Sequence, residues 1–386
     1  MTATELVSKL RAGCDPVWAE SEIRPHIMTE RAGIDGPDWW IVLTLALAKQ
    51  KRLILAEETC RYALSFIPQH QDAHFLLSHI LASRDTARES LYSRQFQALR
   101  PRYRDHPRFV SIETVGRCNA TCSFCPNPVL TRRHTAMDDE LFHKIIADLT
   151  EIPQDHSFAI LPNIVNEPLM DPKLFERCRY INNALPHASL TFFTNLSFLP
   201  PRFFENLATL RNINYWNVSF NAADPDEYTR IMGIPFERTV ANINSLLRFF
   251  RDHPMCKLPL NISRVGDDSA SDQVYLRTCA SLFPDFVEGR DFLVQCKART
   301  DWLGRVETTM TEIPYSLPCG AWFDINIFCD GRVPHCCMDA HGEFTIGDVR
   351  KQSVLEIYNN PSFRNLREHH SAREGIDPCC RCSLMQ

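Results

Sequence analysis

Sixteen cysteines, ten of them crowded into two short stretches, restrict the folds open to this 386-residue chain. The two stretches are residues 118–125 and residues 319–382. Clustered cysteines in a long chain whose N-terminus lacks the apolar core of a signal peptide are more often metal ligands or catalytic groups than disulfides. We therefore expect two thiolate-bound metal centres. The isolated cysteines are predicted to be plain buried side chains, namely Cys14, Cys60, Cys178 and Cys279.

The composition is that of an ordinary globular protein, with 44% hydrophobic and 23% charged residues. The net charge of −5 gives no electrostatic reason to expect nucleic-acid binding. No apolar run is long enough to cross a membrane, and the longest, residues 39–48, predicts a buried helix. We expect a cytoplasmic protein of two or three domains without a membrane or nucleic-acid partner.

Residues 1–100 are predicted to form a helical domain and the start of a linker. The linker itself is expected over residues 91–107. Five residues fall at positions 4, 7, 20, 27 and 32 of one 34-residue frame, namely Trp40, Leu43, Ala56, Ala63 and Pro68. This spacing resembles a tetratricopeptide repeat, in which small residues let paired helices pack closely. An ordinary helical hairpin is the alternative. Either unit can bind a protein partner or brace the next domain.

From residue 109 to about residue 305, short apolar runs alternate with amphipathic helical stretches. The runs predict six strands, at residues 109–115, 157–165, 188–194, 213–220, 258–263 and 291–295. Helices are predicted between them, at residues 137–150, 172–184, 201–211, 236–251 and 271–282. This α/β alternation predicts a parallel sheet that closes into a barrel or part of one, over residues 101–310. The active site of such a barrel lies at the carboxyl ends of its strands.

The loop after the first predicted strand carries three cysteines, Cys118, Cys122 and Cys125. Three thiolates on one short loop can wrap a soft metal centre. A structural zinc ion normally takes four protein ligands, and no fourth lies nearby. A cubane cluster has four irons, so three thiolates leave one iron open for a cofactor. A zinc site with a distant fourth ligand is the alternative.

The spacing Cys-x3-Cys-x2-Cys after a first strand, with the aromatic Phe124 before the last cysteine, resembles the signature of the radical S-adenosylmethionine (SAM) superfamily. The resemblance implies a partial (β/α)6 barrel with a [4Fe–4S] cluster and SAM as cofactors. In that family SAM chelates the open iron. Electron transfer from the cluster then cleaves SAM and releases a 5′-deoxyadenosyl radical, which takes a hydrogen atom from the substrate. It also implies an electron donor such as a flavodoxin or a ferredoxin.

Later strand ends agree with this resemblance. The second strand ends in Asn166-Glu167-Pro168, where the family commonly has Gly-Glu-Pro, so Glu167 is expected to accept a hydrogen bond from the SAM amine. Arg230 resembles the arginine that holds the SAM carboxylate, a task that suits the forked guanidinium. The full set of cofactor-binding residues that the resemblance implies is Phe124, Glu167, Asn195, Ser219, Asn221 and Arg230.

Residues 311–386 are predicted to form a small, metal-organised domain, too short to fold comfortably on a core of its own. Cys319 is followed after eleven residues by Gly331 and after four more by Cys336, and Cys379 and Cys382 come near the end. This pattern resembles the SPASM/twitch extension of the same superfamily. A full SPASM domain carries more cysteines after the last pair and holds two clusters, whereas the shorter twitch form holds one. The resemblance to the shorter form therefore implies one auxiliary [4Fe–4S] cluster on Cys319, Cys336, Cys379 and Cys382.

The doublets Cys336-Cys337 and Cys379-Cys380 leave the choice of ligands open, since one member of each is expected to face away. Cys329 is a spare cysteine in this interpretation. A zinc ribbon with the same four ligands is the alternative. The second centre is therefore expected near the C-terminus whichever metal it holds.

The resemblance fixes the first chemical step but not the outcome. We expect oxidation or epimerisation of a polar small molecule such as a sugar or an aminocyclitol, with radical modification of a ribosomally made peptide as the alternative. A zinc-binding helical-repeat scaffold is the alternative from another class. Epimerisation needs a hydrogen-atom donor, and Cys296, which closes the sixth predicted strand, is the candidate thiol. A buried, unreactive Cys296 is the competing interpretation.

Overall fold

The computed structural model describes residues 2–11, 13–27, 37–66, 71–132, 135–256, 258–266, 269–307 and 315–383. The chain forms two compact units, residues 1–95 and 96–386. The division falls inside helix α6 (Gln71–Tyr103), close to the boundary expected at residue 100. The second expected boundary, at residue 310, lies outside the described residues.

The first unit is helical, as the sequence predicts. Its helices are α1 (Ala3–Arg11), α2 (Pro16–Ile27), α4 (Pro37–Lys49), α5 (Leu53–Phe66) and the first part of α6. Ala46, Ala56 and Ala63 are buried, which lets neighbouring helices approach closely. The tetratricopeptide assignment stays a prediction, because Pro68 lies outside the described residues. Of the helices that the structure describes, none is both long and apolar enough to span a membrane.

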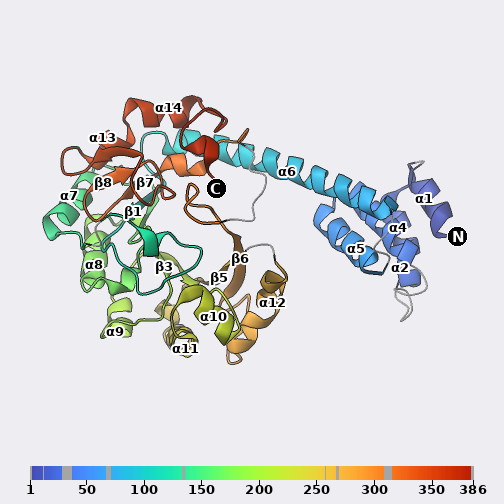
Figure 1. Cartoon of the computed structure of the whole chain (residues 1–386), viewed down its shortest axis with the longest axis horizontal. Helices are drawn as coiled ribbons and strands as arrows, with labels where there is room; N and C mark the ends of the chain where they lie inside the picture. Colours follow the sequence, from blue (N-terminus) through green and yellow to red (C-terminus); the bar gives the residue numbers. More distant parts are fainter. Residues whose placement is uncertain are drawn as a thin grey trace. The chain divides into compact units, whose positions relative to one another are not determined.

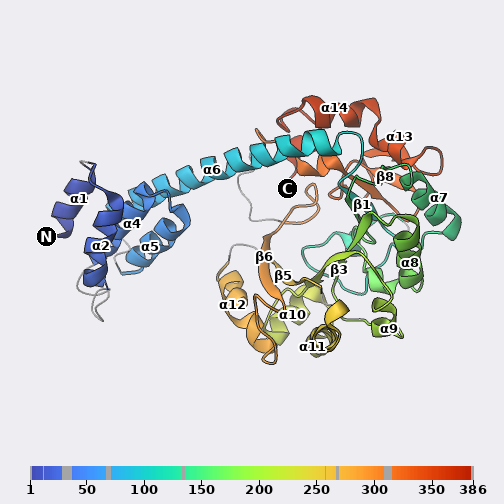
Figure 2. The same ribbon diagram turned by 180° about the vertical axis from the view of Figure 1, so that it is seen from behind.

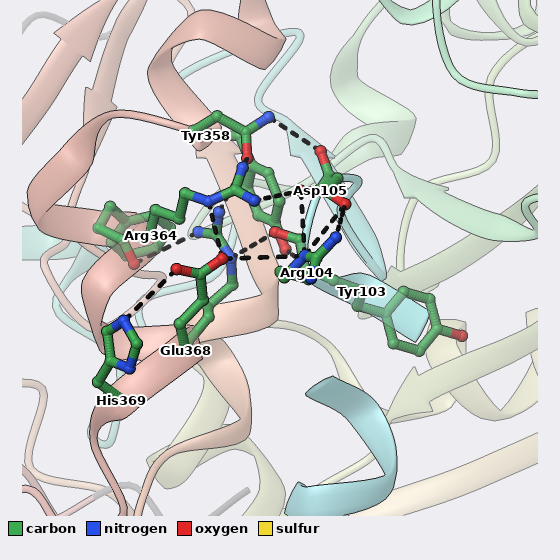
Figure 3. A network of polar contacts seen from close by, with 10 residues as sticks. Tyr103, Arg104, Asp105, Tyr358, Arg364, Glu368 and His369 are labelled. Atoms are coloured by element: carbon green, nitrogen blue, oxygen red, sulfur yellow. Dashed lines mark hydrogen bonds and ion pairs between the residues drawn. The ribbon is translucent and has the colours of Figure 1, made fainter. Parts of the chain in front are cut away.

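The linker expected over residues 91–107 is instead helical as far as Tyr103, because α6 continues through Pro101 near its end. Figure 3 shows how the end of this helix is fixed. The hydroxyl of Tyr358 donates to the carbonyl oxygen of Tyr103 at 2.7 Å, and Arg364 pairs with Asp105 at 2.6 Å. The last turn of α6 is therefore part of the second unit.

A seven-stranded parallel sheet, in the order β6-β5-β4-β3-β2-β1-β7, forms the centre of the second unit. The first six strands are adjacent in chain order, which confirms the predicted partial (β/α)6 barrel. Figures 1 and 2 show the helices following one another around the outside of this curved sheet. The strands are β1 (Phe109–Ile112), β2 (Phe158–Leu161), β3 (Ala188–Thr194), β4 (Ile213–Ser219), β5 (Leu260–Gly266), β6 (Leu293–Ala298) and β7 (Asp324–Ile327).

Two of the barrel helices, α7 and α10, begin at a side-chain capping group. Asp138 accepts a hydrogen bond from the Leu141 amide, and Asp224 accepts one from the Glu227 amide, so α7 and α10 each start after a side-chain N-cap. The sequence did not indicate α10, because it is only eight residues long. The helices are α7 (Asp139–Leu149), α8 (Leu174–Ala184), α9 (Phe203–Leu207), α10 (Pro225–Met232), α11 (Phe236–Asp252) and α12 (Ala270–Thr278).

Strand alternation separates a helix-facing side of the sheet from an inner side. On β4, Trp216 stacks on Phe192 with ring centroids 4.4 Å apart and meets Phe203 of α9 edge-on. Both Trp216 and Phe192 are fully buried. Their neighbours Asn217 and Phe193 therefore point to the inner side of the curved sheet.

The cysteine-rich C-terminal region completes the sheet and shares one hydrophobic core with the barrel, in line with the expectation that it is too short for a core of its own. Its strand β7 pairs in parallel with β1, with Ile325 opposite Val110. Arg108 fixes the register by donating to both carboxylate oxygens of Asp324, at 3.0 and 2.9 Å. The other elements are the hairpin β8 (Arg332–Pro334) and β9 (Thr345–Asp348), and the helices α13 (Val354–Tyr358) and α14 (Pro361–His369).

Candidate active site

The loop that carries Cys118, Cys122 and Cys125 follows β1 and lies against the end of α10. The amides of Thr121 and Ser123 donate to the carbonyl oxygens of Met232 and Ile231, at 3.0 and 2.9 Å. The Sγ of Cys122 lies 3.4 Å from the Sδ of Met232. These contacts place the three cysteines at the carboxyl edge of the sheet. No motif in the sequence indicates them.

Gly233, the residue that ends α10, is what allows this close approach. Its φ is +67°, a left-handed conformation that favours glycine, and a Cβ at this position would lie 2.1 Å from the Oγ1 of Thr121. A side chain here would therefore displace the loop between Cys118 and Cys122.

The three thiols are close enough to interact, and each of the three cysteines is half-buried. Burial raises the pKa of Cys118 to about 12 and that of Cys125 to about 11. Burial also raises the pKa of Cys122, with smaller contributions from the charges of Cys125 and Cys118. Thiols bind a metal as thiolates, so metal binding at this loop would release their protons to solvent. Three neighbouring sulfurs that share one site fit a [4Fe–4S] cluster with one open iron.

Glu167 stands beside this loop, at the end of β2. Its carboxylate accepts hydrogen bonds from the Thr194 hydroxyl at 2.6 Å, the Asn195 amide at 2.7 Å and the Leu169 amide at 3.1 Å. It is buried, and burial raises the pKa of Glu167 to about 7. The Asn195 side chain reaches back to the loop, with its Nδ2 3.8 Å from the Sγ of Cys118. The structure thus brings together Cys118, Glu167 and Asn195.

Other expected cofactor ligands are placed differently. The carbonyl of Phe124 accepts from the Trp302 indole at 3.1 Å. Asn221 is fully buried, and its Oδ1 accepts from the Val265 amide at 2.7 Å. Ser219 ends β4, and Arg230 is exposed on α10. Contact of Phe124, Ser219, Asn221 and Arg230 with SAM stays a prediction.

The four predicted auxiliary ligands line one cavity in the C-terminal region. Cys319, Cys336, Cys379 and Cys382 all face it, and each is buried. Burial raises the pKa of Cys319, Cys336 and Cys379. Among the described residues, no three or more His, Cys, Asp or Glu side chains lie close enough together to hold a single metal ion. Four thiols around one cavity fit a cluster, with one thiolate for each iron.

The remaining cysteines of this region lie outside the lining of that cavity. Cys337 and Cys380, the second members of the doublets, do not line it. Cys329 follows β7, where its Sγ lies 3.4 Å from the Oγ1 of Thr135. The lining therefore favours Cys336 over Cys337 and Cys379 over Cys380 as ligands. The lining also includes Trp322, His335 and Arg373, and the sequence indicated none of these three side chains.

Polar side chains cover the inner side of the sheet between β4 and β6. Lys297 donates to the Oδ1 of Asn217 at 2.7 Å, and the Nδ2 of Asn217 donates to the Oγ of Ser263 at 2.8 Å. The ammonium of Lys297 also lies 5.0 Å from the ring centroid of Phe193. Burial lowers the pKa of Lys297. The same strand parity holds for the polar residues Tyr215, Ser219, Asn261 and Gln295 and for the apolar residues Val265 and Leu293.

Cys296 lies on the opposite side of β6 from Lys297. It pairs with Arg264 of β5, whose guanidinium donates to Asp272 of α12 at 2.7 Å. A Cβ added to Gly266 would lie 2.5 Å from the Cys296 sulfur and 2.3 Å from an Asp272 oxygen. The Cys296 sulfur therefore packs toward α12, not toward the inner side. The strand also extends to Ala298, so Cys296 lies within it and does not close it.

Comparisons with known proteins agree with this arrangement. A model described as the radical SAM superfamily matches residues 112–262, and a model described as the SPASM iron–sulfur cluster-binding domain matches residues 319–383. The two models together match more than half of the 386 residues. They cover the loop of Cys118 to Cys125 and all four cysteines of the C-terminal cavity.

One curated relative is the S-adenosyl-L-methionine-dependent 2-deoxy-scyllo-inosamine dehydrogenase of Niallia circulans. It is 28% identical over 102 residues, which are 26% of this chain and 40% of the relative's length. The chain therefore matches less than half of that relative.

Solved structures with this fold include Streptococcus suis SuiB bound to its precursor peptide SuiA, with a TM-score of 0.52 and 12% identity over 89% of this chain and 85% of that chain. Another is BtrN in complex with AdoMet and 2-DOIA, with a TM-score of 0.48 and 19% identity over 72% of this chain and 93% of that chain. At such identities the likeness concerns the fold alone. The chain belongs to the radical SAM superfamily, with a C-terminal SPASM domain, and its cofactors are [4Fe–4S] clusters and SAM.

Proposed function

We propose that this radical SAM enzyme oxidises a polar small molecule, such as a sugar or an aminocyclitol, bound against the inner side of the barrel. Cys118, Cys122 and Cys125 would hold the cluster that binds SAM. The auxiliary cluster would sit in the C-terminal cavity on Cys319, Cys336, Cys379 and Cys382. Together the bound groups supply a 5′-deoxyadenosyl radical and an electron acceptor, with a flavodoxin or ferredoxin as the external electron donor.

The polar inner side of the sheet carries this proposal. Inward positions of parallel barrels are usually filled by branched apolar side chains. Here Asn217 and Ser263 are buried on that side; Lys297 donates a hydrogen bond to Asn217, which in turn donates one to Ser263. Buried polar groups need partners, and a ligand with many hydroxyl or amino groups satisfies them. The pattern supports a small hydroxylated substrate.

The residues around this surface have separate tasks in the proposed reaction. Glu167 is oriented by three donors before the cofactor arrives, so its carboxylate is preorganised to accept from the SAM amine. Lys297 is held by Asn217 and can donate to a substrate oxygen. After hydrogen abstraction, oxidation requires loss of a hydroxyl proton, and an inner-side amine whose pKa is lowered by burial is suited to receive it.

The orientation of Cys296 supports oxidation over epimerisation. Inversion at carbon needs a hydrogen atom delivered to the substrate radical. The Cys296 thiol, the candidate donor, packs toward α12 on the far side of β6. The name of the curated dehydrogenase relative points the same way.

Substrate-dependent formation of 5′-deoxyadenosine tests the proposal. Reduced enzyme is incubated with SAM and a panel of aminocyclitols, sugars and short peptides. A hydroxylated small molecule should stimulate 5′-deoxyadenosine and yield a product two hydrogens lighter. Lys297→Met should reduce this stimulation, whereas Cys296→Ala, on the opposite side of the same strand, should not. Stimulation by peptides alone would contradict the proposal.

A further inference from the structure

Two aromatic side chains point a ring nitrogen at one of the cysteines of the C-terminal cavity. The indole nitrogen of Trp322 lies 3.4 Å from the sulfur of Cys379, and the Nε2 of His335 lies 3.2 Å from the same sulfur. An indole N–H can only donate, so Trp322 donates to the sulfur. His335 donates as well in the tautomer that carries its proton on Nε2. Both residues line the cavity and are buried.

A buried guanidinium faces the same cavity. Arg373 is only 1% exposed, and its Nη1 donates to the carbonyl oxygen of Cys382 at 3.2 Å. The arginine side chain keeps its positive charge in proteins. Its charge is buried beside the four cysteines that line this cavity and therefore favours negative charge on their sulfurs.

We propose that Trp322, His335 and Arg373 raise the reduction potential of the auxiliary cluster and so make it an electron acceptor for the substrate radical. Reduction adds one negative charge to a cluster already surrounded by thiolates. Hydrogen bonds to the sulfurs and a nearby positive charge stabilise the reduced state more than the oxidised one. The inference rests on the proposed ligands Cys319, Cys336, Cys379 and Cys382.

The electron count of the step is complete. The 5′-deoxyadenosyl radical has taken a hydrogen atom from a substrate carbon that bears a hydroxyl group. The remaining carbon radical would lose one electron to the oxidised auxiliary cluster and the hydroxyl proton to a base, which leaves a carbonyl. An external one-electron acceptor would then reoxidise the cluster. A reduction potential of the auxiliary cluster that is too low would block this electron transfer. The three side chains would therefore affect the reaction through the cluster and not by contact with the substrate.

The test measures the potential directly and needs no substrate. Full-length protein with Cys118→Ala, Cys122→Ala and Cys125→Ala is reconstituted anaerobically, so that one cluster remains, and is titrated with EPR detection. Trp322→Phe keeps the ring, which packs edge-on against Phe96, but loses the N–H. Arg373→Met keeps the chain length but loses the charge. Each should disfavour reduction about tenfold, which is about 59 mV for a one-electron couple.

Two further variants separate tuning from structural damage. Arg373→Lys keeps the charge and should restore most of the potential. Arg367→Met is the matched control, because Arg367 is also fully buried but stacks on Tyr358, 3.7 Å from its ring centroid. Its loss should leave the potential unchanged. Unchanged potentials in Trp322→Phe and Arg373→Met at full iron content would overturn the inference, as would an equal shift in Arg367→Met. A parent protein without iron would instead overturn the ligand assignment on which the inference rests.

Discussion

The backbone nitrogen of Asn195 lies 2.7 Å from a carboxylate oxygen of Glu167, which ties the end of β3 to the end of β2. The other carboxylate oxygen accepts from the Thr194 hydroxyl and the Leu169 amide. A carboxylate held by three donors cannot rotate freely. Its orientation is therefore set by the protein before a cofactor binds.

Glu167→Ala should weaken SAM binding while both clusters are kept. The lost charge-assisted hydrogen bond is worth roughly 1.5–3 kcal/mol, so the dissociation constant should rise at least tenfold. Binding is measured by equilibrium dialysis and iron by a colorimetric assay. Glu176→Ala, an exposed glutamate on α8, is the control. Unchanged SAM affinity in Glu167→Ala would show that the end of β2 does not contact the cofactor.

Replacing Cys118, Cys122 and Cys125 together by alanine should remove about half of the iron and all SAM cleavage. The wild-type protein should hold about eight irons per chain if two cubane clusters are present, and the triple variant about four. Cys178→Ala is the control, since Cys178 is buried in α8 and belongs to neither group. Colourless wild-type protein that contains zinc would contradict the assignment of both sites.

The cysteine doublets allow a sharper test of the auxiliary site. Cys336→Ser and Cys379→Ser should each lower the auxiliary iron, because both side chains line the C-terminal cavity. Cys337→Ser and Cys380→Ser should keep it, because these neighbours do not line the cavity. Iron content and the EPR signal of the reduced protein provide the measurement. Loss of iron in the second pair alone would reverse the ligand choice.

The sequence predicted the first six strands because each is a distinct apolar run bounded by turns, and β3 agrees residue for residue. It did not indicate β7, because four residues inside a cysteine-rich segment carry no periodicity that separates strand from loop. The sequence therefore did not show that the C-terminal region extends the sheet. The resemblance to the SPASM/twitch extension pointed to Cys319, Cys336, Cys379 and Cys382, which line one cavity in the structure, and their role as ligands stays a prediction.

Side-chain direction was harder to predict than strand position. The sixth strand was predicted over residues 291–295, whereas β6 covers Leu293–Ala298. Successive residues of a strand point to opposite sides, so the side on which Cys296 lies could not be read from the apolar pattern. Likewise, Trp322, His335 and Arg373 come together only in the folded chain, and no local pattern identifies them.

Gly233→Ala should disturb the loop of the three cysteines. The new Cβ would lie 2.1 Å from the Oγ1 of Thr121, in a backbone conformation with positive φ. We expect loss of the iron bound by this loop and of SAM cleavage. Gly304→Ala is a matched control, since its φ is also positive, +81°, but a Cβ there meets nothing within 4 Å. Adding Thr121→Ala to Gly233→Ala should recover part of the iron, and no recovery would mean that backbone strain dominates.

The opposite directions of Cys296 and Lys297 lead to an isotope experiment that separates oxidation from epimerisation. In deuterated water, oxidation should give a product two hydrogens lighter without solvent deuterium at the reacting carbon. Epimerisation through a thiol would place one solvent deuterium on the inverted carbon. Cys296→Ala should leave both the product and 5′-deoxyadenosine formation unchanged, because the sulfur packs against α12. Lys297→Met should lower substrate-dependent turnover, because it removes the amine held by Asn217 on the inner side. An inverted, deuterium-labelled product that disappears in Cys296→Ala would contradict oxidation and would require β6 to present its sulfur to the substrate.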